Sequence, residues 1–159
     1  MLDFSFIDAV DTVKASLAPG EYLGQVRKEN GKTYVRCLAT ATIAQYKACK
    51  IDVTGTTGTS VTPVTAATDQ PVGVFEGATS ATTSLPYFWL TTKAVTMTAA
   101  VQGTVTAGDG LSASGTAGAL QTAPFTAATK QGVIAIALEA NASGSANKAI
   151  CLISNYGGQ

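Results

Sequence analysis

A tetrapeptide that occurs twice places the strongest constraint on what this chain can fold into. The sequence TAAT stands at residues 65–68 and again at residues 126–129, and each copy follows a proline and one apolar residue. Each copy then leads into an apolar run that ends in glutamate, at Glu76 and at Glu139. Repetition specifies an architecture without attaching any chemistry to it. The pattern therefore predicts one structural unit used twice, and it argues against an enzyme.

The similarity around the tetrapeptides extends over most of the chain and has the spacing of short β-strands. Two repeats of about 60 residues, at about 38–98 and 99–159, align with a shift of about 61 positions. In both, a short strand reaches an apolar residue, Ile51 or Leu111, before a turn of small residues. Short alternating strands with frequent turns indicate a sandwich or barrel. The predicted fold class is all-β: a small β-barrel or sandwich built from two similar repeats.

The chain before the repeats divides into two predicted parts. Residues 21–38 hold two alternating runs on either side of Asn30-Gly31, and Asn-Gly is a strong signal for a β-hairpin. Residues 1–20 are a separate N-terminal arm or helix, because apolar residues recur there at three- and four-residue steps and predict a helix near 5–17. Everything from residue 21 to residue 159 is the predicted β domain.

Charge is scarce in this sequence, and its two signs balance. Charged residues make up 13% of the chain, and the formal net charge is zero. Binding to a phosphate backbone needs a clustered excess of Lys and Arg, so the balance argues against a nucleic-acid partner and against an anionic membrane surface. The longest apolar run is far shorter than the ~20 residues that span a bilayer. Near-neutral surfaces lack the repulsion that keeps proteins apart, so the composition favours assembly with other subunits.

The residue types that carry most enzyme and metal chemistry are missing or isolated. The sequence contains no histidine, which removes the commonest general base and the usual ligand of Zn, Cu and Fe. Its three cysteines have no metal-like spacing and predict inert thiols. Duplication could bring Glu76 and Glu139 together like the acids of a glycosidase; alternatively, each marks a solvated strand end. The sequence predicts no catalytic residue, no metal site and no cofactor.

Three consecutive aromatic residues near the end of the first repeat are candidates for contact with another subunit. Neighbouring side chains of a strand point to opposite faces, so Tyr87, Phe88 and Trp89 cannot all face one way. If Phe88 points into the core, Trp89 points to the other side of the sheet. Because Trp and Tyr are enriched at interface hot spots, Tyr87 and Trp89 are predicted interface residues, with ordinary burial in the fold as the alternative.

The order of these elements resembles the decoration, or cement, proteins of tailed-phage heads. The resemblance in the second repeat is carried by TVTAGDGL at residues 104–111, QTAP at 121–124 and QGVIAIALE at 131–139. The first repeat has AATDQPVGVF at residues 66–75 for the same element, but KACK at 47–50 replaces the Ala-Gly-Asp of the second copy. The match covers most of residues 38–153. It lies in the order and composition of the segments and not in an invariant motif. The first 37 residues take no part in it.

The resemblance implies a structural, non-enzymatic role. It implies a virion protein, made in the host cytoplasm, that binds the outer surface of an expanded phage head. Its partners would be the major capsid protein, whose neighbouring subunits it bridges, and itself, as a homotrimer. The alternative is a head-fibre or adhesin module that binds a glycan or a receptor.

Two alternative roles are predicted for the N-terminal segment. Its apolar side chains could form an arm that docks on a neighbour or adds a strand to a capsid sheet. The alternative is an ordinary helix that covers one mouth of the β domain. The predicted capsid- or subunit-interface residues are Leu2, Phe4, Phe6, Ile7, Tyr87 and Trp89.

Overall fold

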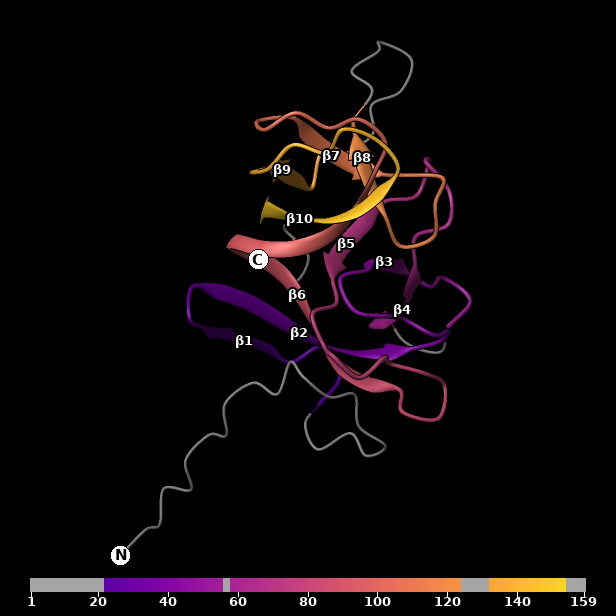
Figure 1. Ribbon diagram of the computed structural model, residues 1–159. Coiled ribbons are helices and arrows are strands. Elements are labelled where there is room, and N and C mark those ends of the chain that lie inside the picture. The colour runs from indigo at the N-terminus through magenta and orange to yellow at the C-terminus, as the bar shows by residue number, and fades with distance from the viewer. Residues whose placement is uncertain (1–21, 56–57, 124–131, 154–159) are drawn as a thin grey trace, which may run out of the picture.

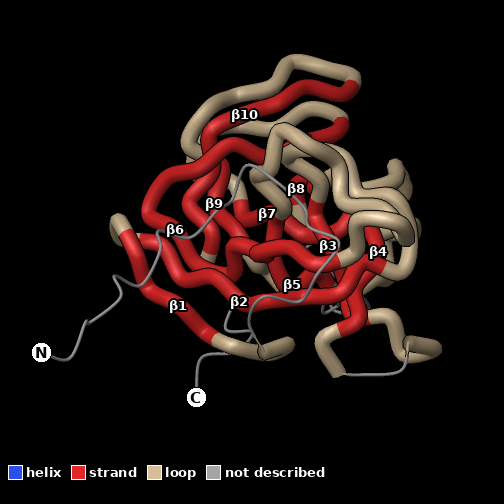
Figure 2. The backbone as a smooth tube through the Cα atoms, turned by 90° about the horizontal axis from the view of Figure 1, so that it is seen from below, coloured by secondary structure: helices blue, strands red, loops and turns tan. Residues whose placement is uncertain are grey.

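The computed structural model describes residues 22–55, 58–123 and 132–153. Throughout that part of the chain the regular structure is β only, with no helix (Figure 2). The strands are β1 (Val26–Glu29), β2 (Lys32–Ala39), β3 (Ala48–Ile51), β4 (Ser60–Pro63), β5 (Pro71–Val74), β6 (Tyr87–Gln102), β7 (Gly110–Ala113), β8 (Leu120–Thr122), β9 (Ala135–Ala137) and β10 (Ser145–Leu152). The all-β prediction is confirmed, while the predicted helix near 5–17 lies outside the described residues.

The strands β2 to β6 close into a ring, which we call the N-terminal barrel. β2 pairs in parallel with β4 through Ala39 and Val61, β4 pairs antiparallel with β3, and β3 pairs antiparallel with β5. β5 meets the first half of β6 at Val74 and Thr91, and this half of β6 pairs back onto β2. Because the last strand pairs with the first, the sheet curves into a small barrel.

The same pairing scheme recurs with the second half of β6, in what we call the C-terminal barrel. β6 pairs in parallel with β8 through Val101 and Leu120, β8 pairs antiparallel with β7, and β7 pairs antiparallel with β9. β9 pairs with β10, and β10 pairs back onto β6. The C-terminal barrel lies above the N-terminal barrel in Figure 1. The duplication predicted from the sequence is therefore present in the sheet topology.

A single long strand belongs to both barrels. β6 has 16 residues, and its register shifts twice near its middle: against β2 between Thr33 and Tyr34, and against β10 between Ile150 and Leu152. Such bulges bend a strand and increase its twist. β6 accordingly turns from the lower barrel into the upper one (Figure 1).

The structural correspondence of the repeats differs from the sequence alignment. Cys49 pairs with Gly73 on β5, and Leu111 makes the corresponding pair with Ala135 on β9. Leu111 therefore corresponds to Cys49, and the equivalence of Leu111 with Ile51 was wrong. The physical reason is that the β3–β4 connection is longer than the β7–β8 connection, while the β4–β5 connection is shorter than the β8–β9 connection. These two differences in length cancel. An alignment of the repeats with one constant shift therefore misplaces the residues near β3 and β7.

Each barrel has its own apolar core, and the two barrels are hydrogen-bonded to each other. The core of the N-terminal barrel consists of Val35, Cys37, Ala39, Ile43, Cys49, Val61, Phe75, Ala81, Phe88 and Leu90. A second core fills the C-terminal barrel and includes Ala48 and Val74 from strands of the N-terminal barrel, together with Val64. The N–H of Ala48 donates to the carbonyl of Gly118 at 2.8 Å, and the N–H of Gly118 donates to the carbonyl of Val64 at 2.7 Å. The barrels thus form one body.

The predicted hairpin forms the strand pair β1–β2. Asn30 and Gly31 connect the two strands with φ angles of 49° and 75°. This left-handed conformation is what a tight hairpin turn demands, and Asn and Gly adopt it at the lowest cost. β2 continues into the wall of the N-terminal barrel, so β1 extends that wall beyond the barrel.

Candidate interaction surface

The structure places the aromatic candidates on the wall that β6 forms in the N-terminal barrel. Phe88 points into the core and packs edge-on against Phe75, with the ring centroids 5.0 Å apart. Trp89 points to the opposite face, as the alternation predicted, but its side chain is only 4% exposed. Tyr87 is half-buried. The indole ring of Trp89 is thus covered within the chain. The role of Tyr87 and Trp89 in a subunit interface stays a prediction.

Two arginines lie over the ring of Trp89. The guanidinium carbon of Arg27 on β1 is 5.3 Å from the ring centroid, and that of Arg36 on β2 is 5.6 Å from it. Arg36 is also the cross-strand partner of Trp89 and is itself buried. A cation over an aromatic face is attracted by the ring quadrupole. Sequence reasoning missed this cluster, because it depends on the β2–β6 register, which the sequence does not reveal.

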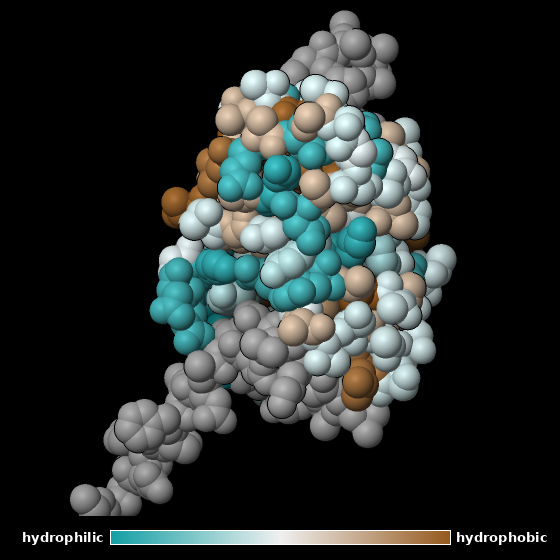
Figure 3. All heavy atoms as spheres, viewed as in Figure 1, coloured by the Kyte–Doolittle hydropathy of each residue, from teal (hydrophilic) through white to brown (hydrophobic). Residues whose placement is uncertain are grey.

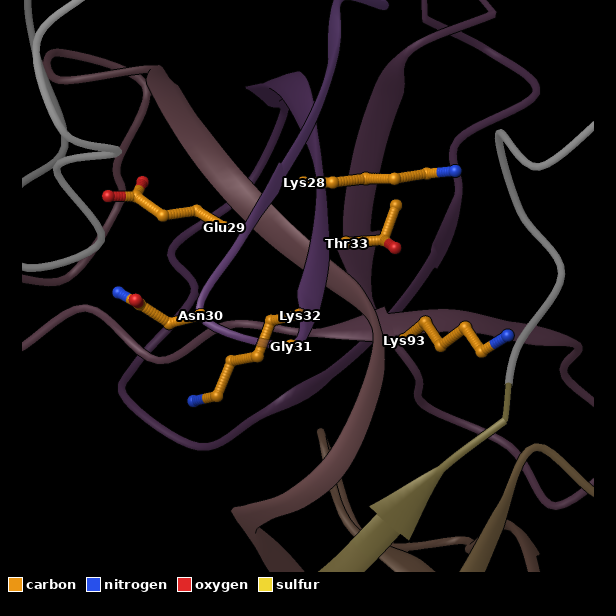
Figure 4. Close-up of a pocket in the computed structure, with 7 residues that line it drawn as sticks. All are labelled: Lys28, Glu29, Asn30, Gly31, Lys32, Thr33 and Lys93. Carbon is orange, nitrogen blue, oxygen red and sulfur yellow. The ribbon is translucent and has the colours of Figure 1, made fainter.

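A shallow depression lies on the opposite face of the β1–β2 hairpin from Arg27. Its volume is about 350 Å³, and it is lined by Lys28, Glu29, Asn30, Gly31, Lys32, Thr33 and Lys93. Lys28 pairs with Thr33 and Thr33 pairs with Lys93, so these three residues form one row across β1, β2 and β6. In Figure 4, Lys28 and Lys93 extend in the same direction from this row. Among the described residues, neither lysine has an acidic partner, whereas Lys32 is paired.

Exposed apolar side chains adjoin this row. Val95 lies two residues beyond Lys93 on β6 and is 77% exposed, although β6 is a central strand. Leu152 pairs with Ala94, so the antiparallel register brings Ile153, which is 41% exposed, to the level of Lys93. Figure 3 shows hydrophobic side chains at the left edge of the molecule, above the hydrophilic hairpin.

These observations define a continuous feature of the surface. We call it the basic–apolar strip, and it consists of Lys28, Thr33, Lys93, Val95 and Ile153. It begins on the hairpin, crosses β6 at the bend between the barrels and ends beside β10. Its charged end and its apolar end suit a partner that carries both acidic and apolar side chains.

The two glutamates of the repeats have different surroundings. The carboxylate of Glu76 is half-buried and accepts hydrogen bonds from Lys32 Nζ at 2.6 Å and from Thr91 Oγ1 at 2.7 Å. Glu139 is exposed and accepts a hydrogen bond from the N–H of Ala149 at 3.2 Å. Each carboxylate is engaged within its own barrel. Glu139 fits the interpretation of a solvated strand end, whereas the side chain of Glu76 is only 16% exposed and is held in an ion pair.

The buried thiols are poorly suited to nucleophilic chemistry. Burial raises the pKa of the Cys37 thiol to about 12, although the charge of Arg36 works in the other direction. Burial, reinforced by the neighbouring Cys37, also raises the pKa of Cys49 well above its ordinary value. Since the thiolate is the reactive form, neither group is an activated nucleophile. Cys151 is half-buried on the outer side of β10.

The described residues hold neither a metal-binding cluster nor a membrane-spanning helix. They contain no group of three or more His, Cys, Asp or Glu side chains that could hold a metal ion. They also contain no helix of the length and hydrophobicity that crossing a membrane requires. The remaining interface candidates, Leu2, Phe4, Phe6 and Ile7, lie outside the described residues.

Comparison with known proteins finds a similarity of structure. No family model matches the sequence, and no curated protein matches it. Three chains of solved structures match the fold, among them the N base of the head fiber gp8.5 of bacteriophage phi29. That match has a TM-score of 0.52 and 10% sequence identity, and it covers 76% of this chain and 93% of the other. At this identity it shows that the two proteins share a fold.

Proposed function

We propose that this protein is a structural, non-enzymatic component of a phage head. In this proposal it binds the outer surface of the expanded shell and bridges neighbouring subunits of the major capsid protein. The observation that carries the proposal is the shared fold with the N base of a phage head fiber, which extends over 93% of that chain. The resemblance of the sequence to phage decoration proteins is an independent argument for the same class.

The physical basis of such a role is linkage between binding and stability. A protein that binds the expanded shell, but not its dissociated subunits, stabilises the shell by its free energy of binding. Cyclic symmetry would multiply weak contacts, so we propose a homotrimer as the bound form. The fold suits this task, because two barrels that share β6 form a stiff body of low charge.

The non-enzymatic part of the proposal is supported by the state of the reactive groups. The thiols of Cys37 and Cys49 are buried with raised pKa values. The carboxylate of Glu76 is occupied by Lys32 and Thr91. Replacing Glu76 and Glu139 with Gln should therefore change stability, while every glycoside-hydrolase assay stays at background for both parent and variant. Hydrolysis by the parent that the variant loses would refute a purely structural role.

The proposal is tested by adding the purified protein to expanded heads that lack it. We expect saturable co-sedimentation and a higher melting temperature of the heads in calorimetry, with an unrelated protein of similar size as the control. Native mass spectrometry of the unbound protein tests the trimer. Heads that neither retain the protein nor gain thermal stability would rule the proposal out.

A second candidate function is a module of a head fiber that binds a glycan or a receptor. The specific observation in its favour is that the matched structure is itself a head fiber base. Sugar binding usually needs an accessible aromatic face, and Trp89 is covered by Arg27 and Arg36. Tyr87 and the 89%-exposed Tyr22 are the accessible candidates. Binding on a glycan array that Tyr87→Ala or Tyr22→Ala abolishes would favour this alternative.

A further inference from the structure

The basic–apolar strip and the N-terminal segment have complementary side chains. The strip offers Lys28 and Lys93, which have no acidic partner among the described residues, next to Val95 and Ile153. Residues 1–21 contain four acidic residues and one lysine, in a chain whose net charge is zero. Opposite charges placed beside matching apolar surface favour binding and fix its register.

The segment carries both kinds of side chain that the strip would attract, acidic and apolar. Residues 2–11 read LDFSFIDAVD, in which Asp3, Asp8 and Asp11 are interspersed with apolar residues. The acids can therefore reach the lysine end of the strip while apolar side chains cover Val95. Covering Val95, an exposed valine on a central strand, would favour binding. Burying apolar surface is the main source of binding free energy.

The length of the connecting chain allows the contact within one molecule. Asp11 is 11 residues before Tyr22, where the described structure begins, so this stretch spans up to about 36 Å when extended. Lys28 is only six residues beyond Tyr22, about 20 Å at most along the chain. A short tether also gives the segment that it carries an effective concentration in the millimolar range. That concentration favours the segment of the same chain over the segment of another copy.

We propose that residues 2–11 bind the basic–apolar strip of their own chain, with the acids on Lys28 and Lys93 and the apolar side chains on Val95. The contact would hold the N-terminal segment against the bend of β6. It assigns the strip an occupant from within the chain, and it does not depend on the proposed role in a phage head.

The proposal is tested by limited cleavage of the purified full chain with chymotrypsin, which cuts after Phe4 and Phe6. Cleavage should be about three- to tenfold faster in Lys28→Glu/Lys93→Glu, the size expected for the loss of two exposed ion pairs. Lys93→Glu alone should accelerate cleavage, while Lys148→Glu, the same charge change on β10, should not. The fluorescence of Trp89, the only tryptophan, reports that each variant is folded.

A charge exchange separates attraction from general destabilisation. Adding Asp8→Lys/Asp11→Lys to the Lys28→Glu/Lys93→Glu protein should restore slow cleavage, whereas the aspartate substitutions alone should accelerate it. In the unmodified protein, raising the salt from about 0.01 M to about 1 M reduces the screening length from about 30 Å to about 3 Å and should accelerate cleavage as well. This second measurement needs no variant to fold.

Two results would overturn the proposal. One is equal cleavage of Phe4 and Phe6 in the parent and in Lys28→Glu/Lys93→Glu at low salt. The other is protection that increases with protein concentration, because the segment would then bind another copy. Loss of capsid binding with unchanged cleavage would bear on the proposed function alone, so the two proposals fail separately.

Discussion

Tyr46 and Gly108 occupy the same position in the two barrels. The N–H of Tyr46 donates to the carbonyl of Phe75 at 2.6 Å, and the N–H of Gly108 donates to the carbonyl of Ala137 at 2.8 Å. Both residues have left-handed backbones, with φ angles of 65° and 96°. The turn before β3 and the turn before β7 are therefore copies of one turn. In one copy a tyrosine adopts a conformation that suits glycine, at a cost of about 1 kcal/mol or more.

Replacing Gly108 with Ala should destabilise the protein by about 1–2 kcal/mol, because the alanine would have to adopt the left-handed conformation. A Cβ at this position meets no atom within 4 Å, so the cost is confined to the backbone. Gly115→Ala is the matched control, since its φ is not positive and its surroundings are equally open. Urea denaturation of both variants measures the difference. Equal stability of the two would contradict this account of the turn.

Replacing Gly73 with Ala should destabilise the protein by about 1–3 kcal/mol for a different reason, which is crowding. A Cβ on Gly73 would lie 2.5 Å from the carbonyl oxygen of Thr91 and 2.8 Å from the side chain of Leu90. The glycine thus lets β5 approach β6 closely where the N-terminal barrel closes. Thermal unfolding checks this, again against Gly115→Ala. A melting temperature equal to that of the control would show that the barrel can relax around the methyl group.

The first TAAT turn should contribute stability that depends on pH. Partial burial works to raise the pKa of Asp69, but it is outweighed by the hydrogen bond from Lys50 and those from the N–H groups of Thr65 and Ala66, so this pKa is lowered. Stabilisation is therefore present above the unfolded value of about 3.9 and is lost as the pH falls through the lower folded value. Asp69→Asn should cost up to about 1 kcal/mol at neutral pH, since the ion pair is partly solvated.

Urea denaturation of wild type and Asp69→Asn at neutral pH and at acidic pH measures this contribution. The difference between the two proteins should shrink as the pH falls below the unfolded pKa of Asp69. Lys50→Gln should remove part of the same difference, because Lys50 Nζ lies 2.8 Å from the Asp69 carboxylate. A difference that stays constant across the whole range would mean that the carboxylate charge does not stabilise the turn.

The three cysteines should differ strongly in their reactivity towards a thiol reagent. Cys37 and Cys49 are fully buried and have raised pKa values, whereas Cys151 is half-buried. At mildly alkaline pH we expect one thiol to react quickly and two to react only at the rate of unfolding. Cys151→Ser should abolish the fast phase, and denaturant should make all remaining thiols reactive. Rapid reaction of two thiols in Cys151→Ser would contradict the buried positions.

The sequence predicted the architecture better than the contacts. Alternating runs, Asn30-Gly31 and the doubled TAAT identified the all-β class, the first hairpin and the duplication. The local equivalence of Cys49 with Leu111 was not accessible, because loops of different length compensate each other between the repeats. Alternation also showed that Trp89 faces away from Phe88. It did not show that arginines cover Trp89, since such contacts depend on register and on bulges.

The shared strand β6 has a mechanical consequence. In most paired domains, the resistance to separation comes from side chains at an interface or from a linker that stretches. Here residues 87–102 form part of the wall of both barrels, so tension between the barrels runs along a covalent backbone that is hydrogen-bonded to neighbouring strands along its length. Separation would have to shear β6 out of one ring, which breaks many backbone hydrogen bonds at once. In the proposed role on a phage head, the backbone of β6 and its hydrogen bonds would therefore carry any tension between the two barrels.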